Sequence, residues 1–146
     1  MNFLEPFDYM LRGIDIHCLF EIEDIETATK VYNAFLGHLN ANNISIEHQR
    51  VFDRPVGPWP TPMWQLVIRP SGESKEDFEK FAQAIGKSFI WLMLNRDKFS
   101  VMIHPNTSTR TGKQSEFTND LIDHTQYVAW LGKAYDLKLN IFKKTF

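Results

Sequence analysis

The chain has 146 residues, 43% of them hydrophobic and 14% aromatic, a composition that supports one domain with a hydrophobic core and excludes a disordered chain. Its formal net charge of −2 gives no indication of a nucleic-acid partner or an anionic membrane surface, and no apolar stretch approaches the roughly 20 residues that span a bilayer. The one cysteine, Cys18, excludes an internal disulfide framework and fits the reducing cytoplasm, where we expect the protein to reside.

We expect a single domain over residues 1–146, with residues 1–12 as an N-terminal extension that lacks the pattern of a secretory signal. From Gly13 to Ile22, apolar and polar residues alternate with a period of two, which predicts a strand with one covered face. Asp24 then offers a helix N-cap, and apolar residues recur at helical spacing as far as Leu39.

The rest of the chain supplies three more strands and a second helix. The strands are expected over residues 44–52, 63–69 and 98–104, and the Pro-rich loop DRPVGPWPTP separates the first two. The helix begins at a pair that resembles a capping box, Ser74 and Asp77, and it carries apolar residues on one face.

This order of elements predicts an α+β fold. Strand–helix–strand–strand–helix–strand is the βαββαβ order of a ferredoxin-like sandwich, with a four-stranded antiparallel sheet and both helices on one face. The residues beyond the fourth strand form a C-terminal extension. The other face of the sheet needs a cover, which is a second subunit, the C-terminal segment or a ligand site.

Several side chains expected on that open face can bind a metal. If the apolar residues of the first strand face the helices, Asp15 and His17 lie on the open side, and the same reasoning places His104 and Gln65 there. The first and fourth strands of this topology are antiparallel neighbours, so Asp15, His17 and His104 converge on one patch. Polar residues on a solvated face that hydrogen-bond to each other are the alternative interpretation.

Two further segments carry candidate site residues. The four prolines of FDRPVGPWPTPM stiffen the loop that holds Arg54, which would pair with an acidic ligand group or with groups near Asp53. In DHTQYVAWLG, Asp123 precedes His124 and an apolar patch. Either this segment is a short C-terminal helix that Asp123 caps, or His124 brings a third imidazole to the open face.

Four segments, DRPVGPWPTPM, WLMLNR, SVMIHPNT and DHTQYVAWLG, occur in the order and at roughly the spacing of the blocks of a known family. In them the chain resembles the DOPA 4,5-dioxygenase family, and the resemblance runs from Ile14 to Leu139. It implies a ferredoxin-like fold, a homodimer formed through the sheet face, and extradiol cleavage of a catechol such as DOPA with non-haem Fe(II) and O2.

The resemblance also assigns roles to residues. His17 matches the second histidine of a His-x-His on the first strand, and His104 matches the histidine of a His-Pro block. The implied metal ligands are His17, His104 and Asp15, which would hold Fe(II), or zinc in its place in the protein as isolated. The implied catalytic pair is Asp123 and His124, which matches an Asp-His pair before Trp-Leu-Gly. The residues expected to contact the substrate are Arg54, Gln65 and Trp59.

The chain departs from the family pattern at three positions. Asp15, Phe52 and Trp59 stand where relatives usually have histidines, and the segment between Asn106 and Asp120 is longer than usual. The prediction therefore has two forms. The first is a ring-cleaving dioxygenase that takes a small aromatic substrate and O2. The second is a relative without catalysis that binds a small aromatic molecule or only dimerises.

Overall fold

The computed structural model describes residues 3, 11–107 and 116–143, so most of the expected N-terminal extension and residues 108–115 of the longer segment lie outside the described residues. The strands are β1 (Leu11–Leu19), β2 (Glu47–Phe52), β3 (Met63–Ile68), β4 (Ser100–Thr107) and β5 (Ala129–Leu131). The helices are α1 (Ile25–Ala41), α2 (Lys75–Asn95) and α3 (Glu116–Thr125), with two 3₁₀ turns, η1 (Ile22–Asp24) and η2 (Leu139–Lys143).

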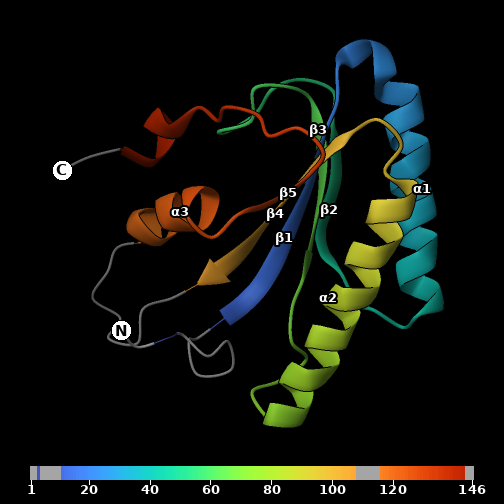
Figure 1. The fold of residues 1–146 in the computed structure, drawn as a ribbon, viewed down its shortest axis with the longest axis vertical. Helices are drawn as coiled ribbons and strands as arrows, with labels where there is room; N and C mark the ends of the chain where they lie inside the picture. Colours follow the sequence, from blue (N-terminus) through green and yellow to red (C-terminus); the bar gives the residue numbers. More distant parts are fainter. Residues whose placement is uncertain (1–2, 4–10, 108–115, 144–146) are drawn as a thin grey trace.

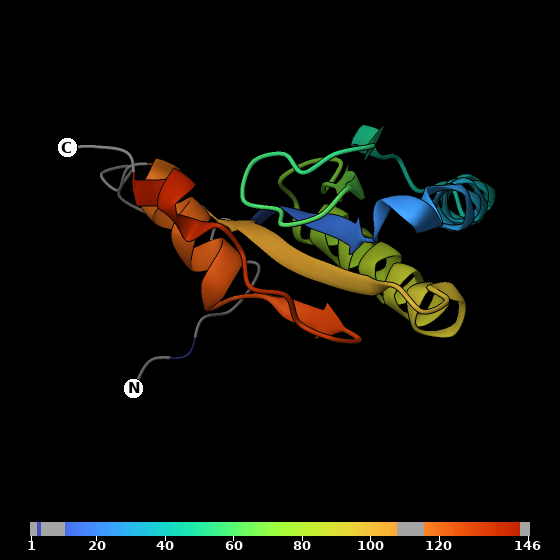
Figure 2. The ribbon, with the colours of Figure 1, turned by 90° about the horizontal axis from the view of Figure 1, so that it is seen from above.

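The strands form one antiparallel sheet in the order β2–β3–β1–β4–β5. Helices α1 and α2 lie on one face of this sheet and α3 on the other (Figure 1). Helix α3 lies beside η2 at the end of the molecule away from α1 (Figure 2). No helix among the described residues is both long enough and apolar enough to cross a membrane.

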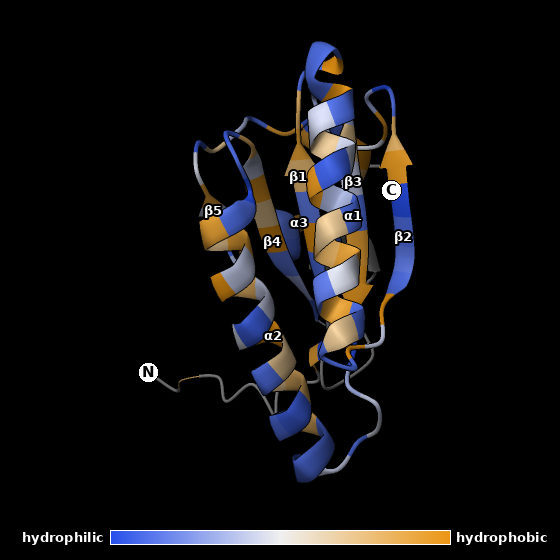
Figure 3. Ribbon diagram, turned by 90° about the vertical axis from the view of Figure 1, so that its right-hand side faces the viewer, coloured by the Kyte–Doolittle hydropathy of each residue, from blue (hydrophilic) through white to orange (hydrophobic). Residues whose placement is uncertain are grey.

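The main hydrophobic core lies between the sheet and the helix pair. Alternate residues of the strands meet the apolar stripes of α1 and α2, as the hydrophobic positions behind the two helices in Figure 3 indicate. Its largest fully buried side chains include Trp64, Phe20, Phe35, Leu39 and Leu92. These were the faces expected to be apolar, so the strands are oriented as the alternation predicts.

The sheet has five strands rather than the four expected, because β5 adds to the free edge of β4. Val101 pairs with Leu131 and Ile103 with Ala129. One of the two interpretations of the segment DHTQYVAWLG is a short C-terminal helix, and this interpretation is wrong for residues 129–131, which form β5. A run of three residues is too short to show a period, so the neighbouring strand rather than local sequence determines its conformation.

Two details at the ends of elements differ from the expectations. β1 ends at Leu19, and Ile22 lies in η1 with 48% of its surface exposed rather than facing the helices. Asp24 occupies the N-cap position of α1 but makes no capping bond, since its carboxylate accepts a hydrogen bond from Lys98 at 2.8 Å. By contrast, the capping box of Ser74 and Asp77 at the start of α2 is confirmed.

Candidate metal centre

The pairing of β1 with β4 brings the expected trio together. Asp15 lies opposite His104, and His17 lies opposite Met102, one position diagonal to His104 on the same face. That face is the one turned away from α1 and α2, because the alternate residues Ile16, Cys18 and Ile103 belong to the helix-side core. β4 also continues to Thr107, so Pro105 lies within the strand and does not mark its end.

The polar atoms of Asp15, His17 and His104 are close enough to share one cation. The Nε2 atoms of the two imidazoles are 3.1 Å apart, and Oδ2 of Asp15 lies 3.9 Å from Nε2 of His17 and 3.6 Å from Nε2 of His104. The three ligand atoms lie within 4.8 Å of one another. An ion held about 2.1 Å from each donor needs donors roughly 3–3.5 Å apart, so small shifts would suffice.

The protonation of the two imidazoles allows both to act as metal ligands. Nδ1 of His104 donates to the carbonyl of Pro105 at 3.0 Å, which leaves the lone pair of its Nε2 pointing toward His17. Burial lowers the pKa of His104 to about 4, and burial followed by the charges of His104 and His124 lowers the pKa of His17 well below its usual value. Both rings are therefore neutral at pH 7.

The two neutral imidazoles meet through their Nε2 atoms, 3.1 Å apart. Either a proton on Nε2 of His17 or a cation can lie between these atoms, and Nδ1 of His17 has no hydrogen-bond partner among the described residues in either case. The chemistry of the donor set fits a bound metal, because it offers two neutral imidazole nitrogens and one carboxylate at a buried position.

Asp15 is held in place by a residue that sequence reasoning missed. The side-chain amide of Asn106 donates to Oδ1 of Asp15, and this leaves Oδ2 on the side of the histidines. Burial raises the pKa of Asp15, and the bond from Asn106 opposes that effect. Asn106 follows His104 by two positions on the same face of β4, so its place in the SVMIHPNT segment was the available signal.

An indole covers the other side of the cluster. The ring of Trp59 packs on the ring of His17 with centroids 3.9 Å apart, and only 4% of Trp59 is exposed. Its loop is fixed at two points, since Trp59 N donates to Val56 O and the C-terminal segment donates from Lys138 N to Pro58 O at 2.8 Å. Together with Leu19, Met63 and Met102, Trp59 forms a second, smaller core on this face.

His124 lies beside the cluster. Its ring packs on that of His104 with centroids 3.9 Å apart, and its Nδ1 donates to the carbonyl of Asp120, which leaves Nε2 as the remaining polar atom. Burial, followed by the nearby His104, lowers the pKa of His124 to about 4. The ring of Phe142 in η2 also packs on the ring of His124, with centroids 4.8 Å apart, a contact that no sequence signal indicated.

Asp123 is buried and its carboxylate is fully engaged with Thr107. Its two oxygens accept hydrogen bonds from the backbone N–H of Thr107 at 2.9 Å and from its hydroxyl at 2.7 Å. This fastens the last turn of α3 to the end of β4. The interpretation of Asp123 as an N-cap is wrong, because it lies near the C-terminal end of α3.

Two of the expected substrate residues lie outside the ligand cluster. Gln65 is opposite His17 on β3, and its amide donates to the carbonyl of His48 at 3.3 Å. Arg54 is exposed on the Pro-rich loop, and no contact between it and the cluster is seen in the described part of the chain.

This molecule is built on an antiparallel sheet, and the second face of the sheet carries two histidines and an aspartate. Comparison with known proteins assigns such a chain to a family. The family model described as the Dopa 4,5-dioxygenase family matches residues 14–141, and the chain belongs to that family.

Two individual proteins are similar over nearly the whole chain. A 21.2 kDa protein of Botryotinia fuckeliana, whose function is uncharacterised, is 27% identical over 144 residues, which cover 98% of this chain and 70% of that protein. The crystal structure of a protein of Nostoc punctiforme, provisionally described as a dioxygenase, is similar with a TM-score of 0.66. It is 24% identical, and the match covers 97% of this chain and 98% of that one, so it supports the fold.

Proposed function

We propose that this protein is an extradiol dioxygenase that cleaves the ring of a small catechol, such as DOPA, with non-haem Fe(II) and O2. The observation that carries the proposal is the buried cluster of Asp15, His17 and His104 in a member of the Dopa 4,5-dioxygenase family. Two imidazoles and one carboxylate are the ligand set typical of non-haem ferrous oxygenases, with coordination positions left open.

In this proposal Asp15, His17 and His104 hold the iron, which would supply a Lewis-acidic centre where a catechol and dioxygen meet. The chain orients these ligands. The carbonyl of Pro105 holds Nδ1 of His104, and Asn106 holds the outer oxygen of Asp15, so that Nε2 of His104 and Oδ2 of Asp15 face inward. Such outer contacts fix the tautomer and the direction of a ligand.

We assign the proton transfer to His124. The bond from its Nδ1 to Asp120 O leaves Nε2 unprotonated in the neutral ring, so Nε2 is able to accept the proton of a catechol hydroxyl. Its packing on His104 keeps it beside the ligand cluster. Asp123 then serves as a positioning residue, because its bonds to Thr107 fix the last turn of α3, which carries His124.

Trp59, Gln65 and Arg54 are proposed to contact the substrate. Trp59 offers a flat apolar surface next to His17, suited to an aromatic ring, and Gln65 occupies the strand position opposite His17. The exposed guanidinium of Arg54 suits the carboxylate of a substrate such as DOPA.

The ferredoxin-like topology, the cytoplasmic location and the homodimer are part of the same proposal. The order β2–β3–β1–β4 with α1 and α2 on one face supports a ferredoxin-like unit that β5 extends. A cytoplasmic homodimer formed through the sheet face stays a prediction. Because the loop around Trp59 and the segment that follows β5 pack on that face, they would supply much of its dimer surface.

Anaerobic reconstitution with ferrous iron, followed by DOPA or catechol, tests this function. We expect oxygen uptake equal to the catechol consumed and a yellow ring-fission product in the visible spectrum. His17→Ala and His104→Ala should abolish both signals, and His124→Ala should keep the bound iron but lose turnover. His48→Ala is the matched control, because His48 is exposed on β2 and lies outside the cluster.

One observation favours a second candidate, a relative that binds a small aromatic molecule without turning it over. Trp59 packs directly on His17, so the indole occupies space next to one of the ligands. Iron bound at one equivalent without oxygen uptake, for any catechol tried, would select this second function. Absence of iron binding in the unaltered protein would overturn the first.

A further inference from the structure

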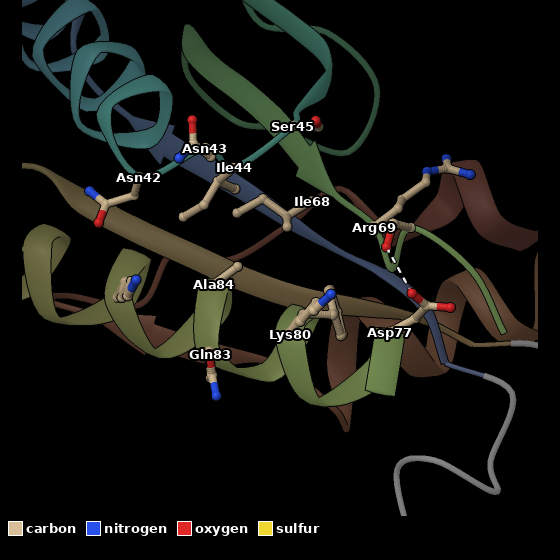
Figure 4. Close-up of a pocket in the computed structure, with 13 residues that line it drawn as sticks. Asn42, Asn43, Ile44, Ser45, Ile68, Arg69, Asp77, Lys80, Gln83 and Ala84 are labelled. Atoms are coloured by element: carbon tan, nitrogen blue, oxygen red, sulfur yellow. Dashed lines mark hydrogen bonds between the residues drawn. The ribbon is translucent and has the colours of Figure 1, made fainter. Parts of the chain in front are cut away.

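A cleft opens on the side of the sheet opposite the metal cluster. It has a volume of about 310 Å³ and lies between the turn that follows α1, the end of β3 and the first half of α2 (Figure 4). None of the residues of the candidate metal centre lines it. A cavity of this size lies at the lower end of the range that takes small ligands.

The cleft combines apolar and polar surfaces. Ile44, Ile68, Phe81 and Ala84 supply apolar side chains, and Figure 4 shows Ile44 and Ile68 facing the space between the end of α1 and α2. Around them lie polar side chains of the turn after α1 and of α2. A ligand with an apolar body and a polar end would match both surfaces.

The charged groups of the lining leave a surplus of positive charge. Asp77 is committed to the capping box, where its bonds with Ser74 hold its pKa below the usual value. Arg69 is committed to Glu47 at 2.9 Å. Lys80 and Lys87 remain as the cations that a ligand would meet.

These two lysines are available for a ligand. Lys80 has an exposed pair with Glu76, four positions earlier on α2, and a weaker electrostatic interaction with Asp77. Exposed interactions of this kind contribute little. Lys87 has no hydrogen bond or ion pair within the described residues. Lys80, Ala84 and Lys87 follow one another at helical spacing on one side of α2.

We propose that this cleft binds a small amphipathic organic anion. The apolar part of the ligand lies on Ile44, Ile68 and Ala84, and its carboxylate or phosphate lies between Lys80 and Lys87. The two lysines are about 10 Å apart along the helix axis, a span that two flexible side chains can close around one anion. The site is separate from the proposed dioxygenase function and does not depend on it.

Chemical-shift mapping of the full chain tests the proposal with three probes: 2-naphthoate, 2-naphthyl phosphate and the neutral 2-naphthalenemethanol. We expect the two anions to shift the amide signals of Asn43, Ile44, Lys80 and Ala84, and the neutral probe to bind at least about tenfold more weakly. The stronger of the two anions identifies whether the site prefers a carboxylate or a phosphate. Binding of the anions should weaken as salt is raised.

Variants locate the site. Lys80→Gln/Lys87→Gln should weaken 2-naphthoate about tenfold, whereas Lys30→Gln, which removes a lysine of similar exposure with the same kind of helix pair on α1, should not. Ala84→Met should also weaken binding by filling the cleft. Unchanged affinity in the double variant, equal affinity for the neutral probe, or no shifts at these residues up to about 5 mM would overturn the proposal.

Discussion

The two faces of the sheet are built from the same strands but differ in what covers them and in what the cover does. On one face, two long helices bury a continuous apolar core that includes Trp64 and Phe35. On the other, a proline-rich loop, α3 and the C-terminal segment enclose a smaller core beside Asp15, His17 and His104. The comparison indicates that the helix face supplies most of the stability, whereas the second face spends some stability to keep polar groups buried.

The largest effect should come from the helix face. Phe35→Ala removes a fully buried ring and should lower the free energy of unfolding by about 3–5 kcal/mol, measured by urea denaturation. Leu94→Ala, at a residue 79% exposed on α2, is the control and should change it by less than about 0.5 kcal/mol. A loss below about 1 kcal/mol for Phe35→Ala would show that this face is not the main source of stability.

The next effect should come from the cluster, and in metal binding rather than in folding. Asp15→Asn keeps the size of the side chain but removes its negative charge. Ferrous iron or zinc should then bind at least about a hundredfold more weakly by equilibrium titration, because Asp15 is itself a proposed ligand and the loss of even an outer contact costs about 10- to 100-fold. The metal-free variant should keep its stability, because Asp15 is buried with a raised pKa and gains little from its charge. Unaltered metal affinity would remove Asp15 from the ligand set.

The stability of the metal-free protein should depend on pH through the second face of the sheet, because that face buries His104. Burial lowers the pKa of His104 to about 4, so between pH 4 and 6.5 the unfolded chain binds a proton that the folded chain does not. Stability should therefore fall as pH drops, by about 2 kcal/mol for His104 alone between pH 7 and pH 5. Urea denaturation of the chelator-treated protein at both pH values measures this.

A matched variant assigns that pH dependence. His104→Gln should show a smaller loss of stability between pH 7 and pH 5 than the unaltered chain, while His48→Gln on exposed β2 should not differ from it. If the His104 variant loses as much stability as the unaltered chain, His104 does not contribute to the pH dependence.

The smallest effect should come from the link between α3 and β4. Asp123→Asn and Thr107→Val should each lower stability by about 1.5 kcal/mol, because both remove hydrogen bonds to a buried carboxylate. The double variant should lose less than the sum of the two, since the same contact is lost once. Simple additivity would indicate that the two residues act independently, and would contradict the link between α3 and β4 through this contact.

Much of the frame of the cluster follows from the sequence. A period of two in β1 assigns Asp15 and His17 to one face, and antiparallel pairing with β4 brings His104 to them. These inferences need only the alternation within each strand and the order of the strands, for which the sequence of elements allows few topologies. The apolar stripes of α1 and α2 were readable for the same reason.

The surroundings of the cluster do not follow from local patterns. The position of Trp59 depends on the path of a proline-rich loop and on its bond to Lys138, a contact between segments about half the chain apart. β5 forms only because β4 offers it an edge, and Asp123 finds Thr107 through the placement of α3. Contacts of this kind are decided by packing, so neither periodicity nor capping signals contain them.

The proline within β4 has a consequence for how copies of this chain behave in a crowded solution. β5 covers the outer edge of β4 at residues 101–103 only, and the strand continues to Thr107. At Pro105 there is no N–H to donate, and the carbonyl already accepts from His104. Pro105 therefore offers a strand from another molecule no donor and only an acceptor that is already engaged, so the same proline that orients a ligand also discourages edge-to-edge aggregation.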